Sequence, residues 1–447
     1  MLNKVQLEYV ESAWIILYQL TSNNKSLLAE TTDLFQKNLK FVLEKFSDKK
    51  LIFSGLFNAY TEDKNVERLK SIINFNDTNG LHDFQYADSG GLQIVNTGAI
   101  VDDELKKKIY KYQAENSNFA FSFDEIPAYR NNDKTRTYVE EWVSPYGEKA
   151  GKNLQEHIEI FNQLKTETKL IPIIQGFDKD QIKTYTLRML DQVKKSDIKK
   201  IGALACGNAH GNGFGTLDNF MTLHSLEIPK SLKKHTHLLG ASGIDRIAPV
   251  LSLIRNGVVP DIERLSFDSS YHTQSYVYGE VQRSVKNLLD GTRIHRLGLV
   301  RNDYVEKILK EMVEFWKDSP TFNFIDMDDL FMHSIYDSEG INSPVKQLKK
   351  RSSVSYCKNV NLIQMYIMFN IYKYITLLND FIDDKLGFYE LFHNEKYFRF
   401  YSGLATVKTF GEYQDWRIGA VNKFKFVRSN NIKSFEKSNN RFVDNLF

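Results

Sequence analysis

The feature that most constrains the fold is a repeated order of elements between residues 50 and 270. A short apolar run is followed by a polar or glycine break, and then by a longer amphipathic stretch. Strands that alternate with helices at this spacing usually pair in parallel, so the pattern predicts a parallel sheet. The apolar runs are LIFSGLF (51–57), FQYADSGG (84–91), NFAFSFDE (118–125), KLIPIIQG (169–176), KIGALACG (200–207), THLLGASG (236–243) and RLSFDSS (264–270).

Seven runs in one series favour a closed barrel over an open sheet, so we predict an α/β fold of the TIM-type (β/α)8 class. Two segments, HRLGLVR (295–301) and WIILYQL (14–20), are candidates for the eighth strand, and the pattern does not choose between them. Beyond about residue 301 the alternation gives way to helices rich in Tyr, Phe and Lys. The predicted domains are therefore a barrel with an N-terminal extension (1–300) and a helical, aromatic-rich C-terminal region (301–447).

Composition is that of a soluble globular protein, with 42% hydrophobic and 26% charged residues in a chain of 447. A net charge of +3 permits contact with a polyanion without requiring it. The two cysteines, Cys206 and Cys357, are too few for a disulfide scaffold and fit a reducing compartment. The first residues lack the apolar core of a signal peptide, and the most apolar segment (363–378) is interrupted by polar residues. We therefore expect a cytoplasmic protein with no membrane contact.

Four polar side chains stand at the C-terminal ends of predicted strands: Asp88, Asp124, Gln175 and Asp268. In a barrel these ends meet on the face that carries the active site. Each residue alone could cap a helix, but together they predict one shared site. Two carboxylates across a cavity can act as nucleophile and as proton donor or acceptor. A further Asp and a Gln offer hydrogen-bonding groups suited to the edge of a nucleobase.

Two glycine-containing turns follow predicted strands. The first, Ser89-Gly90-Gly91, is either an ordinary β-turn or the rim of a site where glycines let a flat ligand approach the backbone. The second lies just before a helix that is expected to start near Ile244, and its N–H groups could bind a phosphate. The residues of this second turn are Gly240, Ala241, Ser242 and Gly243.

The motifs, taken in order, resemble those of the tRNA-guanine transglycosylases. The resemblance covers roughly residues 50 to 275, and a weaker match, FNAY (57–60), is similar to the family's NTYH. The stronger matches are DSGGLQ (88–93) to DSGGFQ, SFDE (122–125) to the second acidic motif, IIQG (173–176) to VQG, IGALACG (201–207) to IGGLAVG, LLGASG (238–243) to LMGVG and SFDSS (266–270) to FDCV.

The resemblance implies a role for each motif residue. Asp268 would be the nucleophile that attacks C1′ and expels guanine, and Asp88 would be the general acid/base that deprotonates the incoming base. Asp124 would bind the guanine-like edge of that base. The remaining base-binding residues would be Gln175 with the backbone of Ala203 and Leu204, the pocket residues Ser89 and Asn58, and the apolar Leu92 and Leu239. Such base exchange needs no ATP or redox cofactor.

Two departures from the family bear on the substrate. The arginine-bearing stretch that reads tRNA after the nucleophile is absent, since no arginine occurs between Asp268 and Arg283. The three-cysteine, one-histidine zinc site is also absent, because Phe369 stands in the histidine's place and the single thiol of Cys357 cannot hold structural zinc. No metal cofactor is therefore expected, and aromatic packing is expected to hold the C-terminal region.

These departures suggest a resemblance to the DNA-modifying branch of phages and bacterial modification clusters. Those enzymes exchange guanine in DNA for a 7-deazaguanine such as preQ0, which protects the DNA from restriction. The expected partners are DNA and the small 7-deazaguanine, in the host cytoplasm if the chain is phage-encoded. A homodimer is compatible with the sequence, which does not decide the oligomeric state. A tRNA-guanine transglycosylase is the alternative.

Two basic segments, PVKQLKKRSS (344–353) and FKFVRSNNIKSFEK (424–437), are either phosphate contacts or solvated faces. A metal-dependent hydrolase with ligands from His235, His237, His272 and Asp268 is a rival function. However, His235-Thr-His237 precedes LLG, so we expect both histidines at the entering end of their strand, away from the catalytic face. A non-catalytic nucleic-acid-binding subunit is a second rival, and the presence of both catalytic aspartates argues against it.

Overall fold

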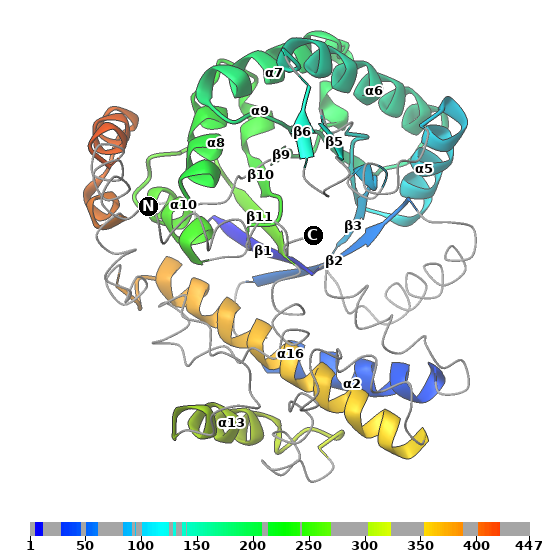
Figure 1. Cartoon of the computed structure of the whole chain (residues 1–447), viewed down its shortest axis with the longest axis vertical. Helices are drawn as coiled ribbons and strands as arrows, with labels where there is room; N and C mark the ends of the chain where they lie inside the picture. The colour runs from blue at the N-terminus through cyan, green and yellow to red at the C-terminus, as the bar shows by residue number, and fades with distance from the viewer. Residues whose placement is uncertain are drawn as a thin grey trace. The chain divides into compact units, whose positions relative to one another are not determined.

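The computed structural model of the chain is shown in Figure 1. Its residues fall into two compact units, one made of residues 1–10, 52–268 and 400–447, and the other of residues 11–51 and 269–399. The residues that the structure describes are 5–11, 28–45, 51–60, 84–91, 94, 101–124, 128–130, 136–139, 141–207, 213–241, 244–269, 303–322, 353–387 and 401–420.

The first unit is built around one parallel sheet of nine strands in the order β7-β4-β3-β2-β1-β11-β10-β9-β8. Strands β7 and β8 are the two sides of Pro172, and they pair with β4 and β9, respectively. The two ends of the order are thus one stretch of chain, which closes an eight-stranded barrel of the TIM type. The strands are β1 Gln6–Glu11, β2 Leu51–Asn58, β3 Gln85–Asp88, β4 Phe119–Phe121, β7 Lys169–Ile171, β8 Ile173–Ile174, β9 Leu204–Cys206, β10 His235–Leu238 and β11 Arg264–Ser269.

All seven predicted apolar runs form barrel strands, but the eighth strand was not found from the sequence. Its place between β11 and β2 is taken by β1, whose sequence is QLEYVE. The two candidates that the sequence offered, 14–20 and 295–301, lie outside the described residues. Strand β1 escapes a search for apolar runs because it carries Glu8, which is fully buried.

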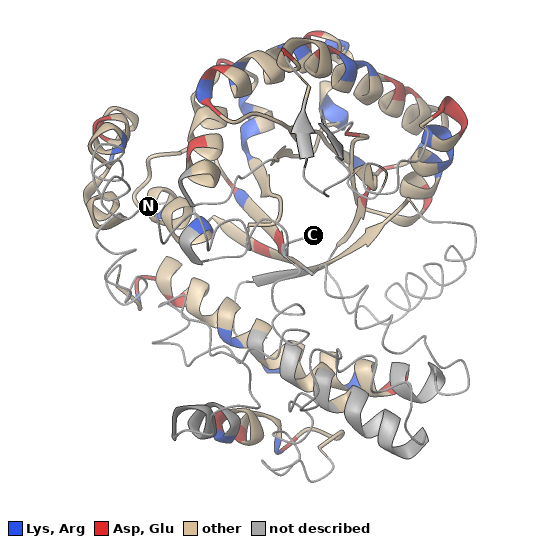
Figure 2. Cartoon of the chain, in the orientation of Figure 1, with Lys and Arg blue, Asp and Glu red and all other residues tan. Residues whose placement is uncertain are grey.

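Helices surround the barrel, as Figure 1 shows. Two of them begin with an aspartate cap, since Asp102 accepts a hydrogen bond from Leu105 N–H and Asp178 accepts one from Gln181 N–H. Acidic and basic residues are interspersed along the outer helices (Figure 2). The helices are α5 Asp103–Asn116, α6 Val143–Gln163, α7 Lys179–Asp191, α8 Gly213–Ser225, α9 Lys230–Lys233 and α10 Ile244–Arg255. An antiparallel pair, β5 Ala128–Arg130 and β6 Arg136–Tyr138, lies between β4 and α6 in the chain and was not predicted.

Side chains inside the barrel divide into an apolar part and a polar part. The polar part comes from strands β1, β2, β10 and β11, and it holds Glu8, Ser54, His235, His237, Arg264 and Ser266, of which all but Arg264 are buried. The apolar part is formed by Val10, Tyr86, Phe119, Phe121, Ile171, Ile173, Ala203 and Ala205. The packed interior leaves the strand ends as the place for a site.

The segment 401–420 packs onto the outside of the barrel. The guanidinium of Arg417 binds both carboxylate oxygens of Asp218 on α8, at 2.7 and 2.5 Å, and Tyr413 donates a third hydrogen bond to Asp218. Asn256, just after α10, donates to the carbonyl of Leu404 at 2.9 Å. These contacts explain why the last part of the chain groups with the barrel.

The second unit is helical, with α2 Leu28–Lys45, α13 Asp303–Trp316 and α16 Ser353–Ile382. The ring of Phe315 packs against Phe369 and Tyr372 on α16, so aromatic contacts do hold this unit together. Asn38 of α2 donates to Asn361 of α16 at 2.8 Å. No helix among the described residues is long and apolar enough to cross a membrane.

The predicted helical C-terminal region is therefore present, but the two units do not follow the predicted boundary at residue 300. Residues 11–51 were expected to extend the barrel, yet they group with the helical unit because α2 packs on α16. Residues 400–447 were expected in the helical region and group with the barrel.

Candidate active site

Asp88 and Asp268 stand at the C-terminal ends of β3 and β11, on the same face of the barrel. Burial is the largest cause that raises the pKa of Asp88, from 3.8 to about 6, and the negative charge of Asp268 adds to the increase. The N–H groups of Gly90 and Ser89 hold that pKa down in part. The two carboxylates thus lie near enough for the charge of one to change the ionisation of the other.

Both glycines after Asp88 lie where neighbouring segments of the chain come close to the backbone. Gly90 has φ +81°, and a Cβ there would overlap Tyr60 and lie 2.8 Å from Asn58 Oδ1. A Cβ on Gly91 would lie 2.5 Å from the carbonyl oxygen of Asp124. The glycines let the loop after β3 pack against the ends of β2 and β4.

Asp124 and Gln175, from the ends of β4 and β8, are both buried and in direct contact. Gln175 Nε2 donates a hydrogen bond to Asp124 Oδ2, and the Tyr185 hydroxyl lies 3.5 Å from Oδ1. Gln175 Oε1 is buried with no hydrogen-bond partner among the described residues, and so is the hydroxyl of Ser89. Because a buried polar atom without a partner is costly, these two atoms suit hydrogen bonds to a ligand.

The other predicted base-binding residues are distributed unevenly. Ile174 pairs with Cys206, which brings Gly207 rather than Ala203 or Leu204 beside Gln175. Ala203 lies deeper, in the apolar interior, and Leu239 packs against that interior. Asn58 Oδ1 accepts a hydrogen bond from Tyr60 N–H at 2.8 Å, so this amide braces the loop after β2. Leu92 lies outside the described residues.

The carboxylate of Asp268 is held by two groups of the neighbouring strand and turn. Its Oδ1 atom accepts a hydrogen bond from Gly240 N–H at 2.8 Å and lies 3.1 Å from His237 Nε2. Gly240 was predicted to bind a phosphate, but its N–H points to the carboxylate instead. Ala241 is fully buried, and Ser242 and Gly243 lie outside the described residues.

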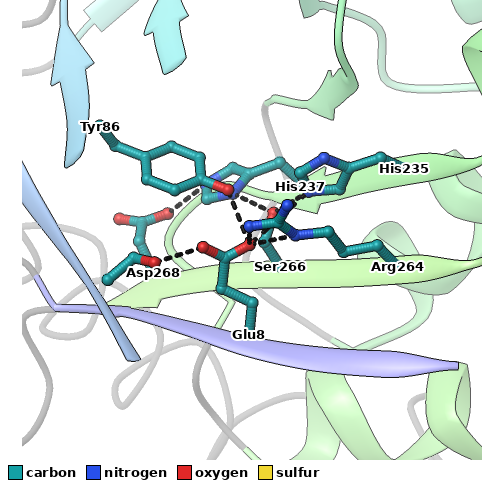
Figure 3. Close-up of polar contacts among 8 residues, drawn as sticks. Glu8, Tyr86, His235, His237, Arg264, Ser266 and Asp268 are labelled. Carbon is teal, nitrogen blue, oxygen red and sulfur yellow. Dashed lines mark hydrogen bonds and ion pairs between the residues drawn. The ribbon is translucent and has the colours of Figure 1, made fainter. Parts of the chain in front are cut away.

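The expected position of the histidines was right for His235 and wrong for His237. Strand pairing sets His235 opposite Arg264 and His237 opposite Ser266. Because alternate residues of a strand share a face, Asp268 is the next residue after Ser266 on the same face of β11. A ring at that level is long enough to reach the carboxylate, as Figure 3 shows. Within the described parts of the chain, no group of three His, Cys, Asp or Glu side chains could hold a metal ion, and His272 lies outside them.

An ion pair between the buried Glu8 and the half-buried Arg264 lies on the same interior face as His237. Arg264 binds Glu8 at 2.6 Å, the Tyr86 hydroxyl donates to Glu8 at 2.7 Å, and Ser54 donates to the other oxygen of Glu8. Burial and the charge of Glu8 raise the pKa of Tyr86 well above its usual value, so Tyr86 keeps its proton. The alternation in HTHL and RLSFD was the signal that could have placed these residues on the face of Asp268.

The two basic segments, 344–353 and 424–437, lie outside the described residues, except for Ser353 at the start of α16. They therefore remain predictions. In comparisons with known proteins, no protein-family model and no curated protein matches the chain, so the resemblance to transglycosylases rests on the motifs alone.

Proposed function

We propose that the chain is a transglycosylase that replaces guanine in DNA with a 7-deazaguanine base such as preQ0. The observation that supports this most is the electrostatic contact between Asp88 and Asp268 at the ends of two barrel strands. Beside them, Asp124 and Gln175 offer a carboxylate and an amide to the edge of a base, with Gln175 Oε1 lacking a partner among the described residues.

In the first half of the proposed reaction, Asp268 attacks C1′ of the deoxyribose and forms an ester. The bond between C1′ and the guanine nitrogen breaks, and the guanine leaves with the electron pair of that bond and a proton from Asp88. In the second half, Asp88 accepts the proton of the incoming base, whose nitrogen attacks C1′ and releases the Asp268 carboxylate. Proton donation and acceptance by one group require a pKa near the working pH, and the pKa of Asp88 is about 6.

We propose DNA rather than tRNA as the substrate because this chain lacks two features of the tRNA enzymes; the barrel itself does not distinguish the two substrates. The stretch after Asp268 has no arginine before Arg283. The two cysteines belong to different units, since Cys206 is in β9 and Cys357 is in α16, and they cannot supply the thiolates of the family's zinc site. Exchange in duplex DNA would require the target nucleotide to be flipped out of the stack, at a cost of a few kcal/mol.

The test is an exchange assay with radiolabelled guanine or preQ0 and three substrates: double-stranded DNA, single-stranded DNA and tRNA. We expect label in DNA with the wild-type chain and none with Asp268→Ala. His157→Phe is the matched control and should exchange label like the wild-type chain. His157 is buried in α6, and neither of its ring nitrogens has a hydrogen-bond partner among the described residues. Label in tRNA alone would favour the tRNA enzyme, and label in no substrate would refute base exchange.

A further inference from the structure

We infer that His237 is a positioning residue for Asp268: it holds Oδ1 and so presents Oδ2 to the sugar carbon. This inference rests on the proposed function and adds to it a residue that the transglycosylase motifs do not include. Both contacts to the Asp268 carboxylate in the described structure go to Oδ1, from Gly240 N–H at 2.8 Å and from His237 Nε2 at 3.1 Å. Two donors on one oxygen restrict the rotation of the carboxylate and leave Oδ2 without a donor among the described residues.

The proton positions along β10 and β11 follow from these contacts. An ionised carboxylate only accepts hydrogen bonds, so the His237 nitrogen that faces it, Nε2, carries a proton. In the tautomer with that single ring proton, Nδ1 is an acceptor, and Ser266 Oγ, 2.9 Å away, donates to it. Ser266 Oγ in turn can accept from His235 Nε2, 2.7 Å away. With that tautomer, the chain of hydrogen bonds from His235 ends on Asp268; the residues that form it are drawn in Figure 3.

The groups around His237 support this arrangement. Burial, together with the charge of Arg264 and the nearness of His237, lowers the pKa of His235 well below its usual value, so His235 is a neutral donor. The ring of Phe121 packs edge-on to the His237 ring, with 4.9 Å between the ring centroids, and the centroid of Tyr86 lies 5.8 Å away. Side chains from β4 and β3 therefore also hold the His237 ring. Among the described residues of this network, Arg264 and Glu8 are the charged groups next to the histidines, and they form an ion pair with each other.

The same contacts serve both halves of the reaction. When Oδ2 bonds to C1′, Oδ1 becomes the carbonyl oxygen of the ester and still accepts from Gly240 N–H and His237 Nε2–H. When the second base attacks C1′, the electron pair of the Oδ2–C1′ bond returns to the carboxylate, and the same donors stabilise the negative charge as it forms. His237 thus gives up no proton and forms no bond during the cycle.

The experiment measures single-turnover formation of the covalent enzyme–DNA complex, across pH, in three variants. His237→Phe keeps the packing against Phe121 and removes the donor. A hydrogen bond to a charged group contributes enough that we expect a loss of about 10- to 100-fold in rate, with the acidic limb of the profile moved to higher pH. His237→Gln retains an N–H donor and should recover most of the rate. The Kd for the free base, measured by equilibrium binding, should not change, because Asp124 and Gln175 are untouched.

Ser266→Ala is the second test, and it decides the matter if His237→Phe does not fold. It leaves the His237 ring in place but removes the donor to Nδ1, so a smaller loss with a pH shift in the same direction is expected. A wild-type rate and pH profile in His237→Phe, or in Ser266→Ala where the first variant is unfolded, would overturn the inference while exchange by the wild-type chain left the proposed function standing. A wild-type chain that exchanges no base would instead refute the proposed function itself.

Discussion

At the scale of single residues, the carboxyl group of Asp88 serves the proposed function but lowers the stability of the fold at neutral pH. Its pKa is raised to about 6 in the folded protein, mainly by burial, whereas an exposed aspartate titrates near 3.8. The folded state therefore binds the proton more tightly than the unfolded state does. Below about pH 3.8 both states are protonated and the residue costs nothing. As pH rises from there through 6, the free energy of unfolding falls.

Replacing this carboxylate should consequently stabilise the protein at neutral pH and abolish exchange. For Asp88→Asn we expect a gain in the free energy of unfolding that is roughly 2 kcal/mol larger at pH 8 than at pH 4, from the shift between the two pKa values. Urea unfolding at the two pH values measures it. Asp191→Asn, at an exposed carboxylate, is the control and should change by less than about 0.5 kcal/mol at either pH. An equal effect of Asp88→Asn at both pH values would contradict the raised pKa.

The sequence predicted the positions of polar side chains correctly where these side chains stand at the ends of strands. Asp88, Asp124, Gln175 and Asp268 were placed at the ends of apolar runs, and those runs are barrel strands. It failed for His237, because distance along the strand was counted without the length of the side chain. The close packing around Gly90 and Gly91 was not predicted, because it depends on contacts across the fold that a single segment does not contain.

At the scale of elements, the two turns that end on the site differ in what they tolerate. Gly90 and Gly240 both have positive φ, at +81° and +60°. A Cβ on Gly90 would overlap the side chain of Tyr60, whereas a Cβ on Gly240 would have no described atom within 4 Å. A side chain at either position would therefore strain the backbone, but only at Gly90 would it also overlap another side chain.

The two alanine variants separate strain from overlap. Gly240→Ala should cost about 1 kcal/mol in the free energy of unfolding, the usual penalty of a left-handed conformation. Gly90→Ala should cost at least about 2 kcal/mol more, because Tyr60 or the loop must also move. Denaturant unfolding of both proteins gives the comparison. Equal costs would mean that the loop after β3 does not pack against the end of β2 as described.

Strand β1 is attached to the barrel through a buried charge. Glu8 is fully buried and accepts from Arg264, Tyr86 and Ser54, which come from three different strands. Removal of one partner of a buried ion pair typically costs about 3 to 5 kcal/mol, since the other charge is left without compensation. We expect this loss for Glu8→Ala and a smaller one for Glu8→Gln, by thermal or urea unfolding. A loss below about 1 kcal/mol for Glu8→Ala would show that β1 is not held by this pair.

At the scale of the whole molecule, the sequence predicted the closed barrel and the helical region but not how the chain is shared between them. The barrel was predictable because its strands and helices alternate over about 220 residues, between positions 50 and 270. The first strand was hidden by its buried glutamate. The grouping of residues 11–51 with the helical unit and of residues 400–447 with the barrel depends on long-range contacts, such as Asn38 with Asn361 and Arg417 with Asp218.

In the proposed reaction, Asp88 and Asp268 act on one nucleotide held between them. The most direct measurement is mass spectrometry of the chain trapped on a guanine-containing DNA, with the attachment point mapped to a peptide. We expect a DNA adduct on Asp268 in the wild-type chain, slower formation of that adduct in Asp88→Asn because the departing guanine loses its proton donor, and no adduct in Asp268→Ala. An adduct on another residue, or base exchange that proceeds in Asp268→Ala, would contradict it.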